Sequence, residues 1–161
     1  MKQYIGTKMI KARPMNRGDY NKYRGWNIPK DENPADEGYL VMYSDGYESW
    51  SPKKQFEEAY RDCMGMTFGI ALELLKKGCK VAREGWNGKG MFLYMTTGSV
   101  VHLDEMKSET ANYLRSFCKD KGMDEIEICP HIDMKTADNK LVIGWLASQT
   151  DMLAEDWVVV E

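Results

Sequence analysis

The sequence has no long apolar run, and this absence excludes a helix that crosses a membrane. A membrane-spanning helix needs about 20 consecutive apolar residues, whereas the apolar runs in these 161 residues are only a few residues long. The first residues, MKQYIGTKMIKARP, also lack the apolar stretch of a secretory signal peptide. We therefore expect no secretory leader and no membrane partner.

An excess of charge of either sign is also missing. The chain has 22 Lys and Arg residues against 25 Asp and Glu residues, a net charge of -3. Bulk charge therefore gives no attraction for a nucleic-acid polymer, and an anionic ligand would need a local basic site. The hydrophobic fraction of 43% is large enough to form a buried core, which excludes a disordered protein.

Metal-binding and catalytic motifs are scarce. The cysteines are Cys63, Cys79, Cys118 and Cys129, and the histidines are His102 and His131. No cysteine pair has CxxC spacing, which argues against a zinc site, and we expect reduced cysteines used as small core residues in a cytosolic protein. GxSxG, HExxH and GxxxxGK[ST] are absent. We expect no metal and no cofactor.

The first 62 residues differ in composition from the rest, because Tyr, Trp, Pro, Asn, Asp and Gly are frequent in them. Residues 27–38 are polar and hold two prolines, which predicts an irregular loop. Ser51 and Pro52 suit the cap and the first position of a helix. We interpret residues 1–62 as a small β-rich module that this helix closes.

A hairpin is predicted inside this module. Residues 39–43 (YLVMY) and 47–50 (YESW) flank the tripeptide SDG. Asp45-Gly46 is a favoured pair for the tight turn of a β-hairpin.

The second predicted unit spans residues 63–161. Thr67 suits a helix cap and Gly78 a helix stop. The apolar stripe of this helix is Phe68, Ala71, Leu72 and Leu75. Strands are predicted at residues 79–83, 91–95, 126–129, 131–136, 141–145 and 157–160. A further helix is predicted at residues 108–122, with Ala111, Leu114, Phe117 and Cys118 facing inward. The fold class is therefore α+β, a small antiparallel β-sheet packed on a helix and preceded by the β-rich module.

The segment REGWNGKG places a tryptophan in a polar turn that is rich in glycine. Trp86 offers a flat face on which a nucleobase can stack, and Asn87 brings both a donor and an acceptor. Arg83 and Lys89 can meet phosphates, and the glycines let a ligand approach the backbone. The segment is therefore either a nucleotide cradle or a tight turn whose tryptophan packs over a sheet edge.

A second polar segment lies between two tryptophans, in WLASQTDMLAEDW. Its consecutive hydrogen-bonding residues are Ser148, Gln149, Thr150 and Asp151. They suit the recognition of ribose hydroxyls and a base edge, or else Thr150 or Asp151 caps a helix.

Acid–base chemistry has one candidate pair. His131 and Asp133 lie two residues apart on a predicted strand and so share a face. Such a pair serves either as an acid–base couple or as a structural hydrogen bond. No nucleophile accompanies it, which favours the structural alternative.

Three segments together resemble a known family. They are FGIALELLKKGCKVAREGWNGKGMFLYM, PHIDMKTADNK and WLASQTDMLAEDWVVVE, in this order. They resemble the Thoeris anti-defence protein family, second type, over residues 66–161. Residues 97–125 match only loosely and look like a variable insert. Residues 1–62 lie outside the family pattern and look like an accessory module of some phage-encoded relatives.

This resemblance implies a phage protein that is not an enzyme and that sequesters a nucleotide signal in the host cytoplasm. Members bind glycocyclic ADP-ribose signals of Thoeris immunity without cleaving them, and some relatives also bind cyclic oligonucleotides at separate sites. The resemblance further implies a homotetramer with ligand pockets between protomers. Trp86 matches the ligand-stacking tryptophan of the family, Asn87 lies in the same turn, and residues 148–151 match the tail motif.

The residues themselves leave two other functions open. One is a small nucleotide hydrolase that uses His131 and Asp133. The other is a protein-interaction module whose contact surface is made by Trp26, Trp50 and the tyrosines of residues 1–62.

Overall fold

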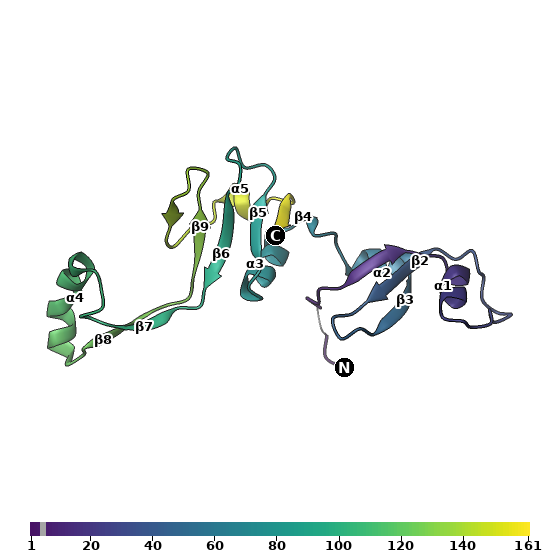
Figure 1. Cartoon of the computed structure of the whole chain (residues 1–161), viewed down its shortest axis with the longest axis horizontal. Helices are drawn as coiled ribbons and strands as arrows, with labels where there is room; N and C mark the ends of the chain where they lie inside the picture. The colour runs from purple at the N-terminus through teal and green to yellow at the C-terminus, as the bar shows by residue number, and fades with distance from the viewer. Residues whose placement is uncertain (4–5) are drawn as a thin grey trace. The chain divides into compact units, whose positions relative to one another are not determined.

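The structure is a computed structural model that describes residues 1–3 and 6–161 (Figure 1). Its contacts divide the chain into two compact units, Met1–Asp62 and Cys63–Glu161. Helices and antiparallel sheets are mixed in the chain, and the first unit is rich in strands. The predicted α+β class is therefore confirmed. Among the described residues, no helix is both long and apolar enough to span a membrane.

The first unit is a three-stranded antiparallel sheet with two short helices. Its strands lie in the order β1-β2-β3. They are β1 (Lys11–Pro14), β2 (Gly38–Met42) and β3 (Glu48–Pro52), and the helices are α1 (Arg17–Tyr23) and α2 (Lys53–Ala59).

The predicted hairpin is present, and its turn chemistry explains it. Gly46 has a φ of 83°, a left-handed conformation that glycine adopts without strain. The Asp45 side chain accepts a hydrogen bond from the Tyr47 amide at 3.0 Å. The helix that follows starts later than predicted, because Ser51 and Pro52 stay paired in β3 and Pro52 only precedes the first helical residue.

The predicted loop before β2 is held by a polar network that the sequence did not reveal. Glu32 forms an ion pair with Arg17 and accepts a hydrogen bond from the buried Asn21 at 3.1 Å. Both partners lie on α1, a helix that begins after the cap residue Asn16. The network fixes the loop against α1.

The second unit contains a six-stranded antiparallel sheet in the order β10-β9-β6-β5-β11-β4. Its strands are β4 (Met64–Met66), β5 (Lys80–Arg83), β6 (Phe92–Thr96), β9 (His131–Lys135), β10 (Leu141–Val142) and β11 (Trp157–Val160). The helix α3 (Phe68–Lys76) packs against β5, β6 and β11. The core between the helix and the sheet includes Met66, Leu75, Val81, Leu93 and Trp157, all fully buried.

The helix α3 follows the predicted apolar pattern with one change. Ala71 and Leu75 are buried as expected, but Leu74 is buried where Leu72 was predicted, and Leu72 is half-buried. Gly78, with a φ of 83°, lies just beyond the helix end and supports the predicted stop. Thr67 occupies the cap position without a side-chain hydrogen bond.

A two-stranded ribbon extends the β6–β9 pair and carries a helix. The ribbon consists of β7 (Ser99–His102) and β8 (Glu125–Ile128), and α4 (Ser108–Lys121) connects them (Figure 1). Ala111 and Cys118 are buried as predicted. Phe117 is 52% exposed, so its predicted inward position is wrong.

Only part of the predicted role of the four cysteines is correct. Cys118 is buried and Cys79 is half-buried, whereas Cys63 and Cys129 are exposed. Cys63 directly precedes β4 and Cys129 directly follows β8. Neither side chain is part of the core.

Candidate functional site

The glycine-rich turn lies beside the start of β11, which brings two distant segments together. The turn follows β5, and Arg83 at the end of β5 pairs with Trp157 of β11. The amide of Glu84 donates to the carbonyl of Asp156 at 3.0 Å. The short helix α5 (Gln149–Met152) precedes β11, so the predicted tail residues lie near the turn.

Arg83 forms an intramolecular clamp. Its Nε donates to Asp156 Oδ1 at 2.7 Å, and its Nη1 donates to Asp151 Oδ1 at 2.9 Å. A further bond joins Nη1 to the carbonyl of Thr150 at 3.3 Å. Hydrogen bonds from Arg83 to Asp156 and then to Asp151 raise the pKa of the guanidinium. The cation expected to meet a phosphate thus faces two carboxylates of its own chain.

The first glycine of the turn is needed for the clamp. The Gly85 amide donates to Asp156 Oδ2 at 2.8 Å. A Cβ at this position would lie 2.5 Å from the same oxygen, closer than a carbon and an oxygen can approach. Gly88 similarly leaves room for the side chains of Met91 and Ala137. These glycines let the protein's own side chains approach the turn, a role that the sequence analysis assigned to a ligand.

Trp86 is half-buried and packs against two other tryptophans, which agrees with the alternative of a tight turn whose tryptophan packs against the sheet. Its ring contacts Trp157 edge to face at a centroid distance of 5.5 Å, and Trp145 at 6.3 Å. Its Nε1 donates to Asp151 Oδ1 at 3.1 Å. The apolar ring gains burial against the core and its N–H finds a buried acceptor, as is usual for tryptophan. The residue as a whole is neither buried nor fully exposed.

Asn87 and Lys89 are exposed polar residues of the turn, as is Glu84 at its start. Neither the Asn87 nor the Lys89 side chain forms a hydrogen bond or an ion pair with any residue that the structure describes. A neutral amide and a cation are therefore presented to solvent close to the half-buried Trp86.

The tail segment forms the helix that the capping alternative predicted, although the cap is a different residue. Ser148 caps α5, and its side chain accepts from the Asp151 amide at 3.1 Å. Asp151 in turn accepts from the Ser148 amide at 3.2 Å, which completes a capping box. The hydroxyl of Thr150 lies 2.8 Å from that of Ser148. Gln149 is exposed.

Asp151 has a strongly lowered pKa. Burial raises the pKa of this carboxyl, but hydrogen bonds from Ser148, Arg83 and Trp86 outweigh the burial and lower it to about 2. The side chain is only 13% exposed. The carboxylate is therefore charged at every physiological pH.

The His131–Asp133 pair has the geometry of a structural anchor. Its atoms Nε2 and Oδ1 are 3.4 Å apart, and the Asp133 side chain is 3% exposed. Asp133 also accepts from Thr96 Oγ1 at 2.7 Å and from the Gly144 amide at 3.0 Å. Burial raises the pKa of this carboxyl, yet these hydrogen bonds bring it below its ordinary value. Both oxygens are thus engaged within the chain: Oδ1 fixes the loop before Trp145 through the Gly144 amide, and Oδ2 bonds Thr96 at the end of β6.

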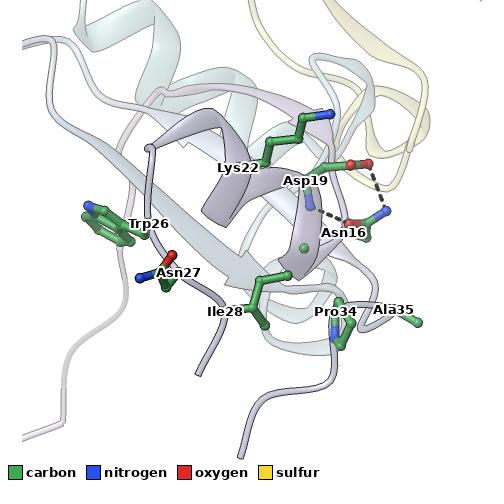
Figure 2. A pocket seen from close by; sticks show the side chains of 9 residues that line it. Asn16, Asp19, Lys22, Trp26, Asn27, Ile28, Pro34 and Ala35 are labelled. Carbon is green, nitrogen blue, oxygen red and sulfur yellow. Dashed lines mark hydrogen bonds between the residues drawn. The ribbon is translucent and has the colours of Figure 1, made fainter. Parts of the chain in front are cut away.

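Hollows lie away from these residues. One, of about 690 Å³, lies in the first unit between α1 and the following loop, where Lys22, Trp26 and Pro34 line it (Figure 2). The other, of about 380 Å³, lies on the ribbon beside His102 and Arg115. Neither is lined by a predicted site residue. Within residues 1–3 and 6–161, no group of three or more His, Cys, Asp or Glu side chains could hold a metal ion.

The aromatic residues of the interaction-module hypothesis differ in exposure. Trp26 is 52% exposed, as that hypothesis requires. Trp50 is half-buried, because its Nε1 donates to the carbonyl of Met15 at 2.8 Å and Arg17 lies over its ring. Tyr4, one of the tyrosines in that hypothesis, lies outside the described residues.

Comparison with known proteins gives the family. The Thoeris anti-defense 2-like domain matches residues 66–160, more than half of the chain. This chain belongs to the Thoeris anti-defense 2-like family. It is 42% identical over 95 residues to the protein named Thoeris anti-defense 2 of Bacillus phage SP01. That alignment covers 59% of this chain and 94% of the phage protein. The resemblance stated from the sequence is confirmed. Membership supports an anti-defence role, in which a phage protein counteracts the Thoeris immunity of the host.

Within the Thoeris anti-defense 2-like domain, the eight predicted site residues fall into two groups. Arg83, Ser148, Thr150 and Asp151 bond to one another or to neighbouring parts of the chain. Asn87, Lys89 and Gln149 are exposed, and Trp86 belongs partly to each group. Sequence reasoning missed Asp156, although an acidic residue directly before a buried Trp-containing strand was a signal for it.

Proposed function

We propose that this protein binds a cyclic nucleotide immune signal of the glycocyclic ADP-ribose type and holds it uncleaved, which blocks Thoeris immunity. Membership of an anti-defence family supports the biological role. The observation that carries the chemical part is Trp86, a half-buried residue whose indole N–H is held by Asp151, next in the chain to the exposed Asn87 and close to the exposed Lys89.

Each of these groups fits a part of such a ligand. A purine stacks on an accessible indole face, which contributes about 1–3 kcal/mol. The ammonium group of Lys89 attracts a phosphate as a point charge. The amides of Asn87 and Gln149 offer both donors and acceptors for ribose hydroxyls and base edges.

Binding without cleavage agrees with the chemistry of the one acid–base pair. Asp133 accepts hydrogen bonds from Thr96 and Gly144, and His131 Nδ1 lies 2.8 Å from the carbonyl of Cys129. Groups engaged in this way are poor candidates for proton transfer to a substrate. A sequestering protein instead needs rigid contacts, because preorganisation reduces the entropy lost on binding.

We further propose a homotetramer whose ligand pockets lie between protomers. Exposed apolar side chains are frequent around β10 and α5, on the unit that holds the predicted site. They are Leu141, Ile143, Leu146 and Leu153, with exposures from 59% to 89%. Burial of such side chains is the usual reason for subunit association. Light scattering coupled to gel filtration measures the subunit number, and a monomer would contradict this part of the proposal.

The direct test of the proposed ligand is calorimetric titration of the full chain. The panel contains glycocyclic ADP-ribose, other cyclic ADP-ribose isomers and cyclic oligonucleotides, the last because the family resemblance implies such ligands for some relatives. Lys89→Ala should weaken the binding of the ADP-ribose ligand, whereas the matched control Lys54→Ala, an exposed lysine of the first unit, should not. Absence of binding to every member of the panel would refute the proposal.

Comparison of His131→Ala with the wild type separates binding from hydrolysis, when both the affinity for the signal and the neutralisation of the signal are measured. His131→Ala should leave both the affinity for the signal and its sequestration unchanged, because His131 has no role in binding. Loss of neutralisation in this variant, with the fold retained, would instead favour the nucleotide hydrolase. Capture of a host protein without any nucleotide binding would favour the interaction module.

A further inference from the structure

Resting on the proposed function, we infer that Asp151 is a positioning residue that fixes the Trp86 indole for ligand stacking, and that Arg83 holds Asp151 and does not contact the ligand phosphates. The predicted site then consists of residues that contact the ligand and residues that only hold the contacting residues in place. Phosphate attraction then depends on Lys89 rather than on Arg83.

The bonding of Asp151 gives the geometric reason. Its Oδ1 accepts from both Arg83 Nη1 and Trp86 Nε1. Its Oδ2 accepts from the amide of Ser148 at 3.2 Å and from its hydroxyl at 2.6 Å. A carboxylate has about four acceptor positions. All four are therefore used within the chain, and none is left for a ligand hydroxyl.

The same residue also anchors the neighbouring aromatic ring. The backbone carbonyl of Asp151 accepts from Trp157 Nε1 at 3.0 Å. Trp157 is fully buried and contacts Trp86 edge to face. One residue of α5 thus holds the N–H groups of two packed indoles, and this fixes the plane of Trp86 relative to the sheet.

The charge of the clamp explains why Arg83 is a poor phosphate contact. One guanidinium lies between the carboxylates of Asp151 and Asp156. The three groups together carry a net charge of about -1 when ionised, which follows from their ordinary pKa values. An anionic ligand gains nothing by approaching this cluster, whereas Lys89 carries an exposed charge that no described carboxylate neutralises.

A double-mutant cycle tests the coupling between Asp151 and Trp86. Asp151→Ala removes the acceptor, and Trp86→Phe removes the donor while it keeps an aromatic face. Asp151→Ala alone should weaken binding of glycocyclic ADP-ribose about tenfold, which corresponds to about 1.4 kcal/mol. In the Trp86→Phe background, the same change should cost less than about twofold, because the bond is already missing. Glu155→Ala, an exposed acidic neighbour, is the control and should bind as the wild type does.

A measurement without ligand separates this inference from the proposed function. The indole N–H signal of Trp86 is assigned by its absence in Trp86→Phe. Its exchange with solvent should be about tenfold faster in Asp151→Ala than in the wild type, which corresponds to the loss of a hydrogen bond of about 1.4 kcal/mol. If the wild type binds no nucleotide, the proposed function fails, and the exchange rate alone decides whether Asp151 positions the indole.

Salt dependence tests the role of Arg83, and it serves even where Asp151→Ala fails to fold. Arg83→Lys keeps the charge but cannot bridge two carboxylates. It should weaken binding about tenfold, equal to about 1.4 kcal/mol, and keep the salt dependence of the wild type. Lys89→Ala should flatten the salt dependence, because it removes an exposed charge that salt screens. Additive effects in the cycle, unchanged indole exchange, or wild-type binding by Arg83→Lys would each overturn the inference.

Discussion

A single residue of the glycine-rich turn can both pack against the core and take part in the proposed ligand site. Trp86 shows this most clearly, because its ring contacts two other tryptophans while the residue is only half-buried. The sequence revealed the residue but not its packing. Asp151 and Asp156 lie 68 and 73 positions away from their partner Arg83, and no local pattern predicts contacts over that distance.

The packing of Trp86 leads to a prediction about stability. Trp86→Ala should lower the free energy of unfolding by about 1–3 kcal/mol, below the 3–5 kcal/mol typical of a fully buried tryptophan, because the ring is half-buried. Urea denaturation followed by circular dichroism measures the change. Leu146→Ala, at a side chain that is 89% exposed, should change the midpoint little. Equal midpoints for Trp86→Ala and the wild type would show that the ring adds nothing to the core.

The low pKa of Asp151 predicts how stability depends on acid. The folded-state pKa of about 2 lies below the ordinary value of 3.8, so the charged form stabilises the folded protein. This contribution is complete above about pH 5 and is lost progressively as the pH falls from there through 2. The difference in unfolding free energy between the wild type and Asp151→Asn should therefore be constant from pH 7 to about pH 5 and shrink below it. A difference that already shrinks between pH 7 and pH 5 would contradict the low pKa.

At the scale of elements, turn chemistry and strong periodicity were predictable, whereas short strands were not. Asp45-Gly46 predicted the hairpin, and the apolar stripe predicted α3. The strands β1, β4 and β7 were missed, because segments of three or four mostly exposed residues have no alternation to detect. The predicted strand at 141–145 shortens to β10, because Asp133 binds the Gly144 amide and Trp145 turns back to bond Ile132.

Two glycine substitutions should have opposite effects at this scale. Gly85→Ala places a Cβ 2.5 Å from Asp156 Oδ2, which should separate the turn from β11 and destabilise the protein by about 1–3 kcal/mol. Gly69→Ala in α3 meets no atom within 4 Å and should stabilise it by about 0.5–1 kcal/mol, the helix preference of alanine over glycine. Thermal unfolding of both variants compares them directly. Destabilisation of equal size at both positions would argue against a special close approach at Gly85.

At the scale of the whole molecule, the family match and the predicted site belong to one unit. The match begins at residue 66, and the eight predicted residues lie between positions 83 and 151. The aligned part makes up 94% of the phage relative, so this domain occurs there almost alone. Residues 1–62 lie outside the family match, and the hollow beside Trp26, one of the aromatic residues of the interaction-module hypothesis, lies within them.

This division predicts the result of a truncation. A fragment of residues 63–161 should fold and bind glycocyclic ADP-ribose within about twofold of the full chain, a difference of about 0.4 kcal/mol. The physical reason is that every contact described for the site joins residues of the second unit. Circular dichroism checks the fold and calorimetry the affinity. A folded fragment that binds more than tenfold more weakly would place part of the site in the first unit.

The central claim is that the protein holds its signal intact, and recovery of the ligand tests it most directly. The full chain is incubated with glycocyclic ADP-ribose, the unbound nucleotide is removed by filtration, and the protein is then denatured by heat. Mass spectrometry of the released material should show the intact cyclic nucleotide. Recovery of linear or fragmented products alone would contradict the account.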